Sequence, residues 1–335
     1  MKGIFFAIIA FIVTTLIIPL IIITTFDINI PLRDKQVKYQ QETIESDMKI
    51  KVYNHITDEI MELYLEEYLE NVVAAEMPGS FELEALKAQA VAARTYAIWK
   101  INRFSSTENP IHPGASLCTD HQHCQEWLSS EELKSRHGKE WMNKYWPKIQ
   151  EAVATTAGVI MTYNMQPIEP LYHSTSGGQT ENSEDVYVSA LPYLRSVSSP
   201  YEERSPVLVD SKTVTIKEFI NAIKKKYADF IIREKNISTE MKIVERTTGG
   251  SIKLIKIGNK EMKGSEVREL FQLRSANFTF KVSGDKIQFT TRGYGHGVGM
   301  SQWGANGMAE RGSSYEDILK HYYQGVVLSK LKSYR

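Results

Sequence analysis

The 335-residue sequence predicts an α+β protein: a mixed helical and β core with a smaller α+β subdomain, preceded by one transmembrane helix. Segments with helical spacing and segments with alternating apolar residues follow one another along most of the chain. With 42% hydrophobic and 24% charged residues, the composition is that of a globular protein that can bury a substantial core. Residues 3–25, in contrast, contain no charged side chain, which indicates a separate membrane segment.

The charged residues argue against a nucleic-acid partner. The 40 Lys and Arg residues balance the 40 Asp and Glu residues, so the formal net charge is zero. A basic surface of the kind that binds phosphate backbones is therefore not expected.

The apolar segment over residues 3–25 is long enough to cross a membrane, because a spanning helix needs about 20 residues. A signal peptide has a shorter apolar region of about 7–15 residues and a small-residue cleavage site, which residues 26–30 do not offer. We therefore expect a single-pass anchor in the cell membrane over residues 1–25, a polar juxtamembrane stalk over residues 26–48, and an extracytoplasmic body.

The core is expected to span residues 49–212 and 286–335. Pro78 disfavours helix at the residue before it and Ser80 can cap the next helix, so two helices should meet there. Residues 105–138 show little periodicity and are expected to form a long structured loop. The elements expected in the core are a strand at 49–53, helices at 65–75, 81–101 and 146–158, a hairpin of 159–163 with 168–172, and a final helix from residue 314.

The chain changes character near residue 213, and residues 213–285 are expected to form the smaller α+β subdomain. A Lys-rich segment at 215–227 has helical spacing, and a short helix is expected at 265–271. Strands are expected around the Thr-Gly-Gly turn at 248–250 and on either side of Gly284-Asp285.

Glu76 is the first candidate for chemistry, because it lies between two helices within apolar and small residues. Such surroundings raise the pKa of a carboxyl group, which keeps the group protonated and able to act as a general acid near neutral pH. The alternative is a solvent-facing Glu at a helix end.

Lys87 and Arg94 lie on one narrow stripe of the following helix, together with Leu83, Ala90 and Ala97, when residues are projected at 100° each. They could point into a cleft beside Glu76 and bind a polar or anionic substrate. Alternatively, both side chains extend along the edge of the core with their charges in water.

Four soft or borderline metal ligands lie within 13 residues: His112, Cys118, His123 and Cys124. Zinc favours such sets, and four protein ligands would make a closed, structural site and leave His121 free. The rival interpretation is a disulfide between Cys118 and Cys124, which is reasonable in an extracytoplasmic chain.

Two further segments are typical of a sugar-binding cleft. Residues 292–305 alternate Gly with polar and aromatic residues, including His296, Gln302 and Trp303, but lack the surrounding βαβ unit of a nucleotide site. Residues 172–181 supply several hydroxyls, among which Tyr172, Ser174 and Ser176 are expected to line the wall of the cleft. The alternative for the Gly-rich segment is a strand end packed tightly in the core.

Together these motifs resemble the stage II sporulation protein D family of peptidoglycan lytic transglycosylases. The resemblance is carried in order by Glu76-Met-Pro, residues 83–96, the His/Cys set, Ser174-Thr-Ser-Gly-Gly and residues 295–305. One departure is Trp303, where a Tyr would be expected. The resemblance runs from about residue 50 to residue 330.

The resemblance implies an enzyme that degrades the septal wall during engulfment of the forespore, in the space between the mother-cell and forespore membranes. It implies glycan strands without stem peptides as substrate, with a sporulation membrane protein and a cell-wall amidase as partners. Glu76 would be catalytic, Lys87 and Arg94 functional basic residues, and the His/Cys set a site for one Zn²⁺.

The expected chemistry is an intramolecular transfer with one carboxyl group. Glu76 donates a proton to the oxygen between N-acetylmuramic acid and N-acetylglucosamine, and then accepts the proton of the muramic acid 6-hydroxyl as that oxygen attacks C1. Unlike most glycoside hydrolases, this reaction needs no second carboxylate. The alternatives are zinc-dependent hydrolysis at the His/Cys set and a non-catalytic glycan-binding scaffold that recruits an amidase.

Overall fold

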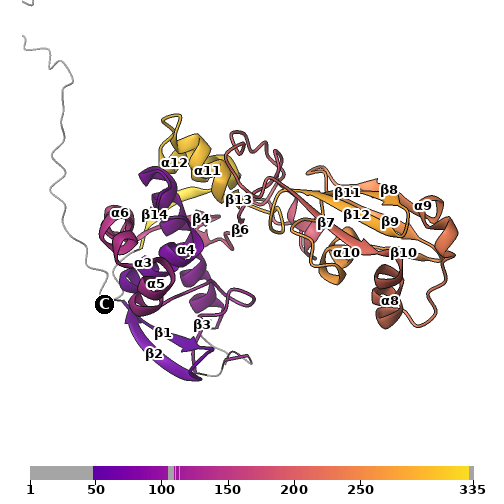
Figure 1. Cartoon of the computed structure of the whole chain (residues 1–335). Helices are drawn as coiled ribbons and strands as arrows, with labels where there is room; N and C mark the ends of the chain where they lie inside the picture. The colour runs from indigo at the N-terminus through magenta and orange to yellow at the C-terminus, as the bar shows by residue number, and fades with distance from the viewer. Residues whose placement is uncertain (1–47, 105–108, 110, 113, 332–335) are drawn as a thin grey trace, which may run out of the picture. The chain divides into compact units, whose positions relative to one another are not determined.

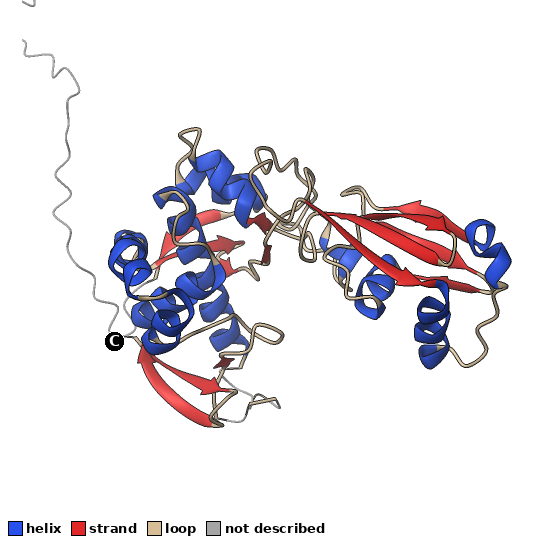
Figure 2. Cartoon of the chain, in the orientation of Figure 1, coloured by secondary structure: helices blue, strands red, loops and turns tan. Residues whose placement is uncertain are grey.

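The computed structural model describes residues 48–104, 109, 111–112 and 114–331, and over these residues the fold is α+β, as predicted. Figure 1 follows the helices and strands along the chain. Long strands dominate between residues 209 and 292, whereas helices dominate the described residues before and after (Figure 2).

The expected membrane localisation is corrected by the structure. Among the described residues, no helix is both long and apolar enough to cross a bilayer. The 21-residue helix α4 (Leu83–Arg103) has sufficient length but carries several charged side chains. The anchor predicted at residues 1–25 lies outside the described residues, as does the stalk except for Met48.

The larger hydrophobic core surrounds α4, most of whose side chains are buried. Its many Ala residues let the helices α3 (Leu65–Glu76), α6 (Lys139–Thr155), α11 (Gln302–Ala309) and α12 (Tyr315–Tyr322) approach it closely. The sequence located α3 and α4 to within two residues, because both have clear helical spacing. Smaller elements complete this part of the chain: β1 (Lys49–Asn54), β2 (Glu59–Tyr64), β3 (Leu117–Cys118), α5 (Ser130–His137), β4 (Val159–Tyr163), β5 (Gln166–Pro167), β6 (Tyr172–His173), α7 (Ser183–Val186), β13 (Met300–Ser301) and β14 (Val327–Lys330).

Short sheets connect distant segments of this core. In the sheet β2-β1-β3, the parallel pairing of Tyr53 with Cys118 attaches the His/Cys segment to the first strand. A second sheet has the order β14-β4-β5. A third consists of β6 and β13 in parallel, with Tyr172 opposite Met300, so the hydroxyl-rich and Gly-rich segments lie side by side.

Three sequence predictions in this core were wrong. Residues 130–137 form α5, which begins with a capping box of Ser129 and Glu132, rather than part of a loop. Helix α6 begins at Lys139, and Pro147 lies in its interior instead of its first turn. Tyr172 pairs with β13 and not with β4, because a strand this short takes its partner from tertiary packing.

A second hydrophobic cluster occupies residues 216–289. Its two sheets have the strand orders β10-β9-β8 and β11-β12-β7, and the predicted helix at 215–227 is α8, capped by Thr215. A separate subdomain at 213–285 remains a proposal, and the sheet that contains β7 and β12 would extend it to residues 209–292. The elements are β7 (Val209–Thr215), α8 (Ile216–Lys226), η2 (Glu234–Asn236), α9 (Ile237–Glu240), β8 (Met241–Arg246), β9 (Ile252–Ile257), β10 (Lys260–Met262), α10 (Gly264–Leu270), β11 (Phe278–Ser283) and β12 (Lys286–Arg292).

Candidate active site

A cleft of about 1040 Å³ collects most of the residues that the sequence singled out. Its walls come from the end of α3, the segment after the His/Cys set, α6, β6 and the Gly-rich segment. Large concave sites lined by aromatic and polar groups are where substrates usually bind. The predicted residues that line it are Glu76, His123, Cys124, Tyr172, Ser174, His296, Gln302 and Trp303.

Glu76 is the last residue of α3, and its carboxyl group faces this cleft. Burial raises the pKa of Glu76 to about 7, although hydrogen bonds from the Glu126 backbone and Tyr172 act in the opposite direction. The Glu126 N–H donates to Oε1 of Glu76 at 2.8 Å. A carboxyl group with this pKa is protonated in about half of the molecules at neutral pH, which suits a general acid.

Tyr172 connects Glu76 to Gln125, a buried side chain that the sequence analysis did not identify. The Tyr172 hydroxyl donates to Oε1 of Gln125 at 2.9 Å. The Gln125 amide donates in turn to Tyr68 and to the backbone carbonyl of Ala93, both at 3.4 Å. Gln125 is 2% exposed, so its amide holds Tyr172 in place from the interior of the protein.

The four His/Cys ligand atoms converge, all within 4.8 Å of one another. Nδ1 of His123 lies 3.2 Å from Nε2 of His112, 3.5 Å from the sulfur of Cys118 and 3.6 Å from that of Cys124. The two cysteines are not joined by a disulfide. The group could therefore hold a metal ion.

Two histidines of this segment, His112 and His121, differ in whether they belong to the group. Nδ1 of His112 donates to the Ala115 carbonyl at 2.7 Å, which leaves Nε2 unprotonated and directed at the cluster. The side chain of His121 is 66% exposed, beside Asp120, and is not part of the group.

The hydroxyl-rich segment is organised by a buried carboxylate, Glu202, which is 3% exposed. Glu202 accepts hydrogen bonds from the backbone and hydroxyl of Ser176 at 3.0 and 2.8 Å, and from the Gly177 N–H at 2.7 Å. The hydroxyls of Ser199 and Ser301 also donate to it. The predicted substrate contact of Ser176 is therefore corrected, since its hydroxyl is already used inside the protein.

On the Gly-rich side, Trp303 packs edge-on against Phe81, with ring centroids 4.7 Å apart, and lines the cleft. The backbone N–H of Trp303 donates to the Ser174 carbonyl at 3.0 Å. The Gly-rich and hydroxyl-rich segments are therefore hydrogen bonded to each other at the cleft wall. His296 and Gln302 line the same cleft.

Comparison with known proteins decides the family. The chain is 43% identical over 294 residues to stage II sporulation protein D of Bacillus subtilis (strain 168), which covers 88% of this chain and 82% of the relative. This chain belongs to the stage II sporulation protein D family. A model of the family, described as stage II sporulation protein, matches residues 53–163, a range that includes Glu76 and the His/Cys set.

Other members and relatives of the stage II sporulation protein D family agree with this assignment. Stage II sporulation protein D of Bacillus amyloliquefaciens is 41% identical over 301 residues, with 90% of this chain and 84% of the relative covered. A B. subtilis protein named amidase enhancer is 30% identical over 310 residues, with 78% of this chain and 40% of that protein covered.

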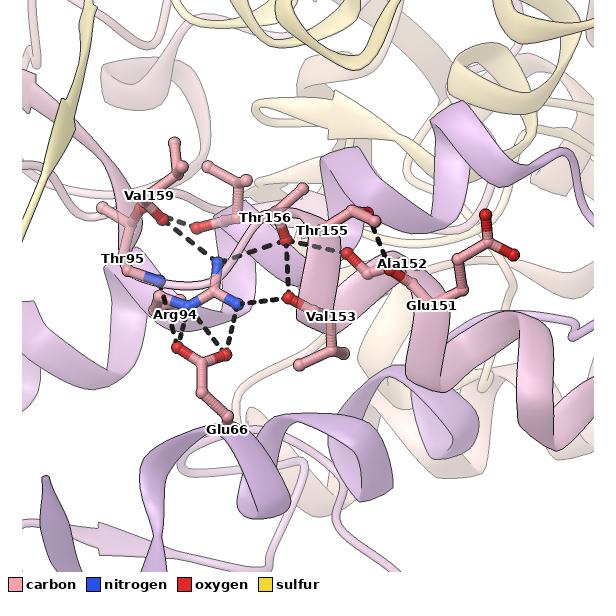
Figure 3. Close-up of polar contacts among 11 residues, drawn as sticks. Glu66, Arg94, Thr95, Glu151, Ala152, Val153, Thr155, Thr156 and Val159 are labelled. Atoms are coloured by element: carbon pink, nitrogen blue, oxygen red, sulfur yellow. Dashed lines mark hydrogen bonds and ion pairs between the residues drawn. The ribbon is translucent and has the colours of Figure 1, made fainter. Parts of the chain in front are cut away.

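In this member of the stage II sporulation protein D family, Arg94 does not reach the cleft, which corrects its predicted substrate contact. Its side chain is fully buried, and Nε donates to Glu66 at 2.9 Å (Figure 3). The guanidinium also donates to the carbonyls of Val153 and Val159, at 3.3 and 3.1 Å. Carbonyls at a helix end lack intrahelical donors, so Arg94 satisfies the end of α6 while it joins α3 to β4.

Lys87 requires the same correction. Its ammonium group pairs with Glu84 at 2.8 Å, and it does not line the cleft. The helical projection correctly placed Lys87 and Arg94 on one stripe of α4. It could not show that this stripe faces other elements of the core.

Proposed function

We propose that this chain is a peptidoglycan lytic transglycosylase of sporulation. It would cleave the bond between N-acetylmuramic acid and N-acetylglucosamine in peptide-free glycan strands and leave 1,6-anhydro-N-acetylmuramic acid ends. In the cell this reaction would degrade the septal wall and allow engulfment of the forespore. The observation that carries the proposal is the half-buried Glu76 in the large cleft, with a pKa raised to about 7.

The proposed reaction uses Glu76 twice. Protonated Glu76 donates to the glycosidic oxygen as the bond to C1 breaks, which releases the N-acetylglucosamine hydroxyl. The resulting carboxylate accepts the 6-hydroxyl proton as O6 bonds to C1. The carboxyl group ends the cycle protonated, so the proton balance closes without water.

Tyr172 is suited to assist the middle of this cycle. Its hydroxyl has one proton, which it donates to Gln125 in the structure. Once Glu76 has lost its proton, the same hydroxyl can turn toward the carboxylate, and a hydrogen bond to the charged form stabilises that form. Tyr172 would therefore stabilise the Glu76 carboxylate until it accepts the next proton.

The other carboxylates of the cleft have different partners. Glu126 pairs with Arg136 at 3.0 Å. Burial raises the pKa of Glu169, against the opposing charges of Arg103 and Lys100. Since hydrolases of the common type need two cooperating carboxyl groups, Glu76 acting alone favours the transglycosylase reaction.

Zn²⁺ is the proposed metal of the His/Cys group. Two thiolates and two imidazole nitrogens are a typical tetrahedral zinc set, and such a closed set is structural and supplies no catalytic water. The chain continues from Cys124 directly to Gln125 and Glu126, which contact Tyr172 and Glu76. The metal would thus fix the position of Gln125 and Glu126, which in turn position Tyr172 and Glu76.

We expect one zinc ion per chain, bound by His112, Cys118, His123 and Cys124. Replacing Cys118 by Ser should lower the zinc content of the purified protein to near zero and reduce strand cleavage strongly, because Gln125 and Glu126 lose their support. The control His121→Ala should keep its zinc. Elemental analysis checks this, and a Cys118–Cys124 disulfide in freshly isolated, metal-replete protein would exclude the site.

A second candidate function follows from the name of the relative called amidase enhancer. In this function the chain binds glycan strands without cleaving them and recruits or activates a cell-wall amidase. An amidase also fits the first proposal, since it would remove the stem peptides, and a sporulation membrane protein is the other proposed partner.

A digest of purified, peptide-free glycan strands separates the candidates. A lytic transglycosylase leaves 1,6-anhydro ends, a hydrolase leaves reducing ends, and a scaffold binds the strands but leaves them intact. Mass spectrometry of the products distinguishes the three results. We expect anhydro ends from this chain, and exclusively reducing ends would overturn the proposal.

A further inference from the structure

Arg268, on α10, is a half-buried arginine with no carboxylate partner among the described residues. Its Nε donates to the Leu273 carbonyl at 3.3 Å, and its side chain makes no other hydrogen bond within the described residues. In contrast, Arg274 pairs with Asp210 at 3.1 Å. Burial lowers the pKa of Arg268, and no carboxylate opposes this effect. Since buried charges in proteins are normally paired, this guanidinium is suited to an anion from outside.

The position of Arg268 connects it to the proposed active site. It lines a cavity of about 130 Å³ that shares Gly295 and His296 with the main cleft. The cleft itself, at about 1040 Å³, takes a sugar chain, whereas the smaller cavity has room for a substituent. The ring of Tyr187, which also lines the cleft, lies 5.8 Å from that of His296.

Except for the exposed Lys263, the other charged side chains around this small cavity have partners. Lys253 pairs with Glu245 at 2.7 Å, and Glu184 pairs with Arg195. The carboxylate of Asp185 accepts from the Asn182 amide at 3.2 Å. The exposed Lys263 and the hydroxyl-bearing residues Ser251 and Ser265 complete the polar lining. Arg268 is therefore the half-buried, unpaired cation that an incoming anion would meet in this cavity.

The two histidines beside it do not add charge. Burial, with a contribution from Arg268, lowers the pKa of His173 to about 4 and that of His296 to about 3, so both are neutral at neutral pH. Nδ1 of His173 donates to the Val298 carbonyl at 3.2 Å, which leaves Nε2 as an acceptor. This nitrogen is buried and has no partner, although His173 lines the cleft. An N–H or O–H of a bound sugar would satisfy it.

We propose that Arg268 binds the lactyl carboxylate of N-acetylmuramic acid and thereby selects strands that have lost their stem peptides. This inference rests on the proposed function. In a peptide-bearing strand the same carboxyl group is an amide and carries no charge. A guanidinium can grip a free carboxylate through two parallel hydrogen bonds, a contact that the amide cannot reproduce. Arg268 thus takes the anion-binding role that was one of the two alternatives for Arg94 in the sequence.

The test measures binding to the full chain with Glu76→Gln, which keeps the strands uncut. Arg268→Gln in this background should weaken binding of peptide-free glycan strands by about tenfold to a hundredfold, as expected for loss of a hydrogen bond to a charged group. Binding of N-acetylglucosamine oligosaccharides, which have no lactyl group, should change by less than about twofold. Peptide-bearing strands should be equally insensitive.

Two further variants keep the test decisive. Arg233→Gln removes an exposed arginine that lines neither cavity and should leave all three ligands unaffected. Arg268→Lys keeps the charge without the paired hydrogen bonds, and should give an intermediate loss even if Arg268→Gln folds poorly. Equal losses on strands with and without lactyl carboxylates, or no loss on peptide-free strands, would overturn the inference alone. Failure of the Glu76→Gln parent to bind peptide-free strands would overturn the proposed function as well.

Discussion

Glu76→Gln is expected to reduce cleavage of peptide-free strands by about 10²–10⁴-fold while strand binding persists. This is the range that general acid and base groups contribute, and here one group has both roles. Gln matches the shape of Glu but has no proton to transfer. The matched control is Glu70→Gln, which changes another partly buried glutamate of α3 outside the cleft. Substantial cleavage by Glu76→Gln would move the chemistry to a different group.

The pH dependence of cleavage should report the same carboxyl group. Because the first step needs protonated Glu76, whose pKa is about 7, the rate should fall as the pH rises through about 7. The free energy of unfolding should also fall as the pH rises. The pKa of Glu76 is raised on folding from 4.5, so stability is lost as the pH rises toward 7 and the buried group becomes charged. Above that pH, Glu76→Gln should raise the unfolding free energy by on the order of 1–3 kcal/mol.

Arg94→Ala is expected to lower the free energy of unfolding by about 3–5 kcal/mol, the usual cost of breaking a buried ion pair by removing one partner. The substitution leaves Glu66 without its cation and removes the hydrogen bonds that the guanidinium donates to the carbonyls of Val153 and Val159. Lys87→Ala is the control, since the pair of Lys87 with Glu84 lies partly in solvent, and ion pairs near the surface contribute about 0–1 kcal/mol.

Urea unfolding followed by tryptophan fluorescence measures both variants. Should Arg94→Ala unfold at the wild-type urea concentration and yet lose strand binding, Arg94 would return to the cleft as a substrate contact. A strand-cleavage defect in Arg94→Ala that follows the fraction of unfolded protein would agree with the structure.

The sequence predicted best the features that depend on near neighbours. Helices α3, α4 and α8 follow from helical spacing, and the final helix was expected from residue 314, next to the observed start of α12. The four ligands of the His/Cys group come together because they lie within 13 residues. A raised pKa of Glu76 was likewise expected from the apolar residues on either side of it, and in the structure burial is its largest cause.

Partners that are distant in the chain could not be predicted in this way. Arg94 meets Val153 and Val159 only because α6 and β4 pack against α4, so its stripe gave no sign of which elements it faces. Glu202 collects its donors from three separate stretches. Arg268, on α10, lines a small cavity that shares Gly295 and His296 with the cleft. In each case the role of a charged side chain is decided by segments that no local pattern links to it.

The parallel pairing of β6 with β13 makes the order of synthesis relevant. Tyr172 and Met300 are separated by more than a third of the chain, so the wall that carries His296 and Trp303 leaves the ribosome long after Glu76 and the His/Cys group. Contacts of such large sequence separation form late in folding, because a long loop must be closed first. A nascent chain therefore acquires Glu76 early but its cleft only near the end of translation, which delays the proposed strand cleavage until the protein is nearly complete.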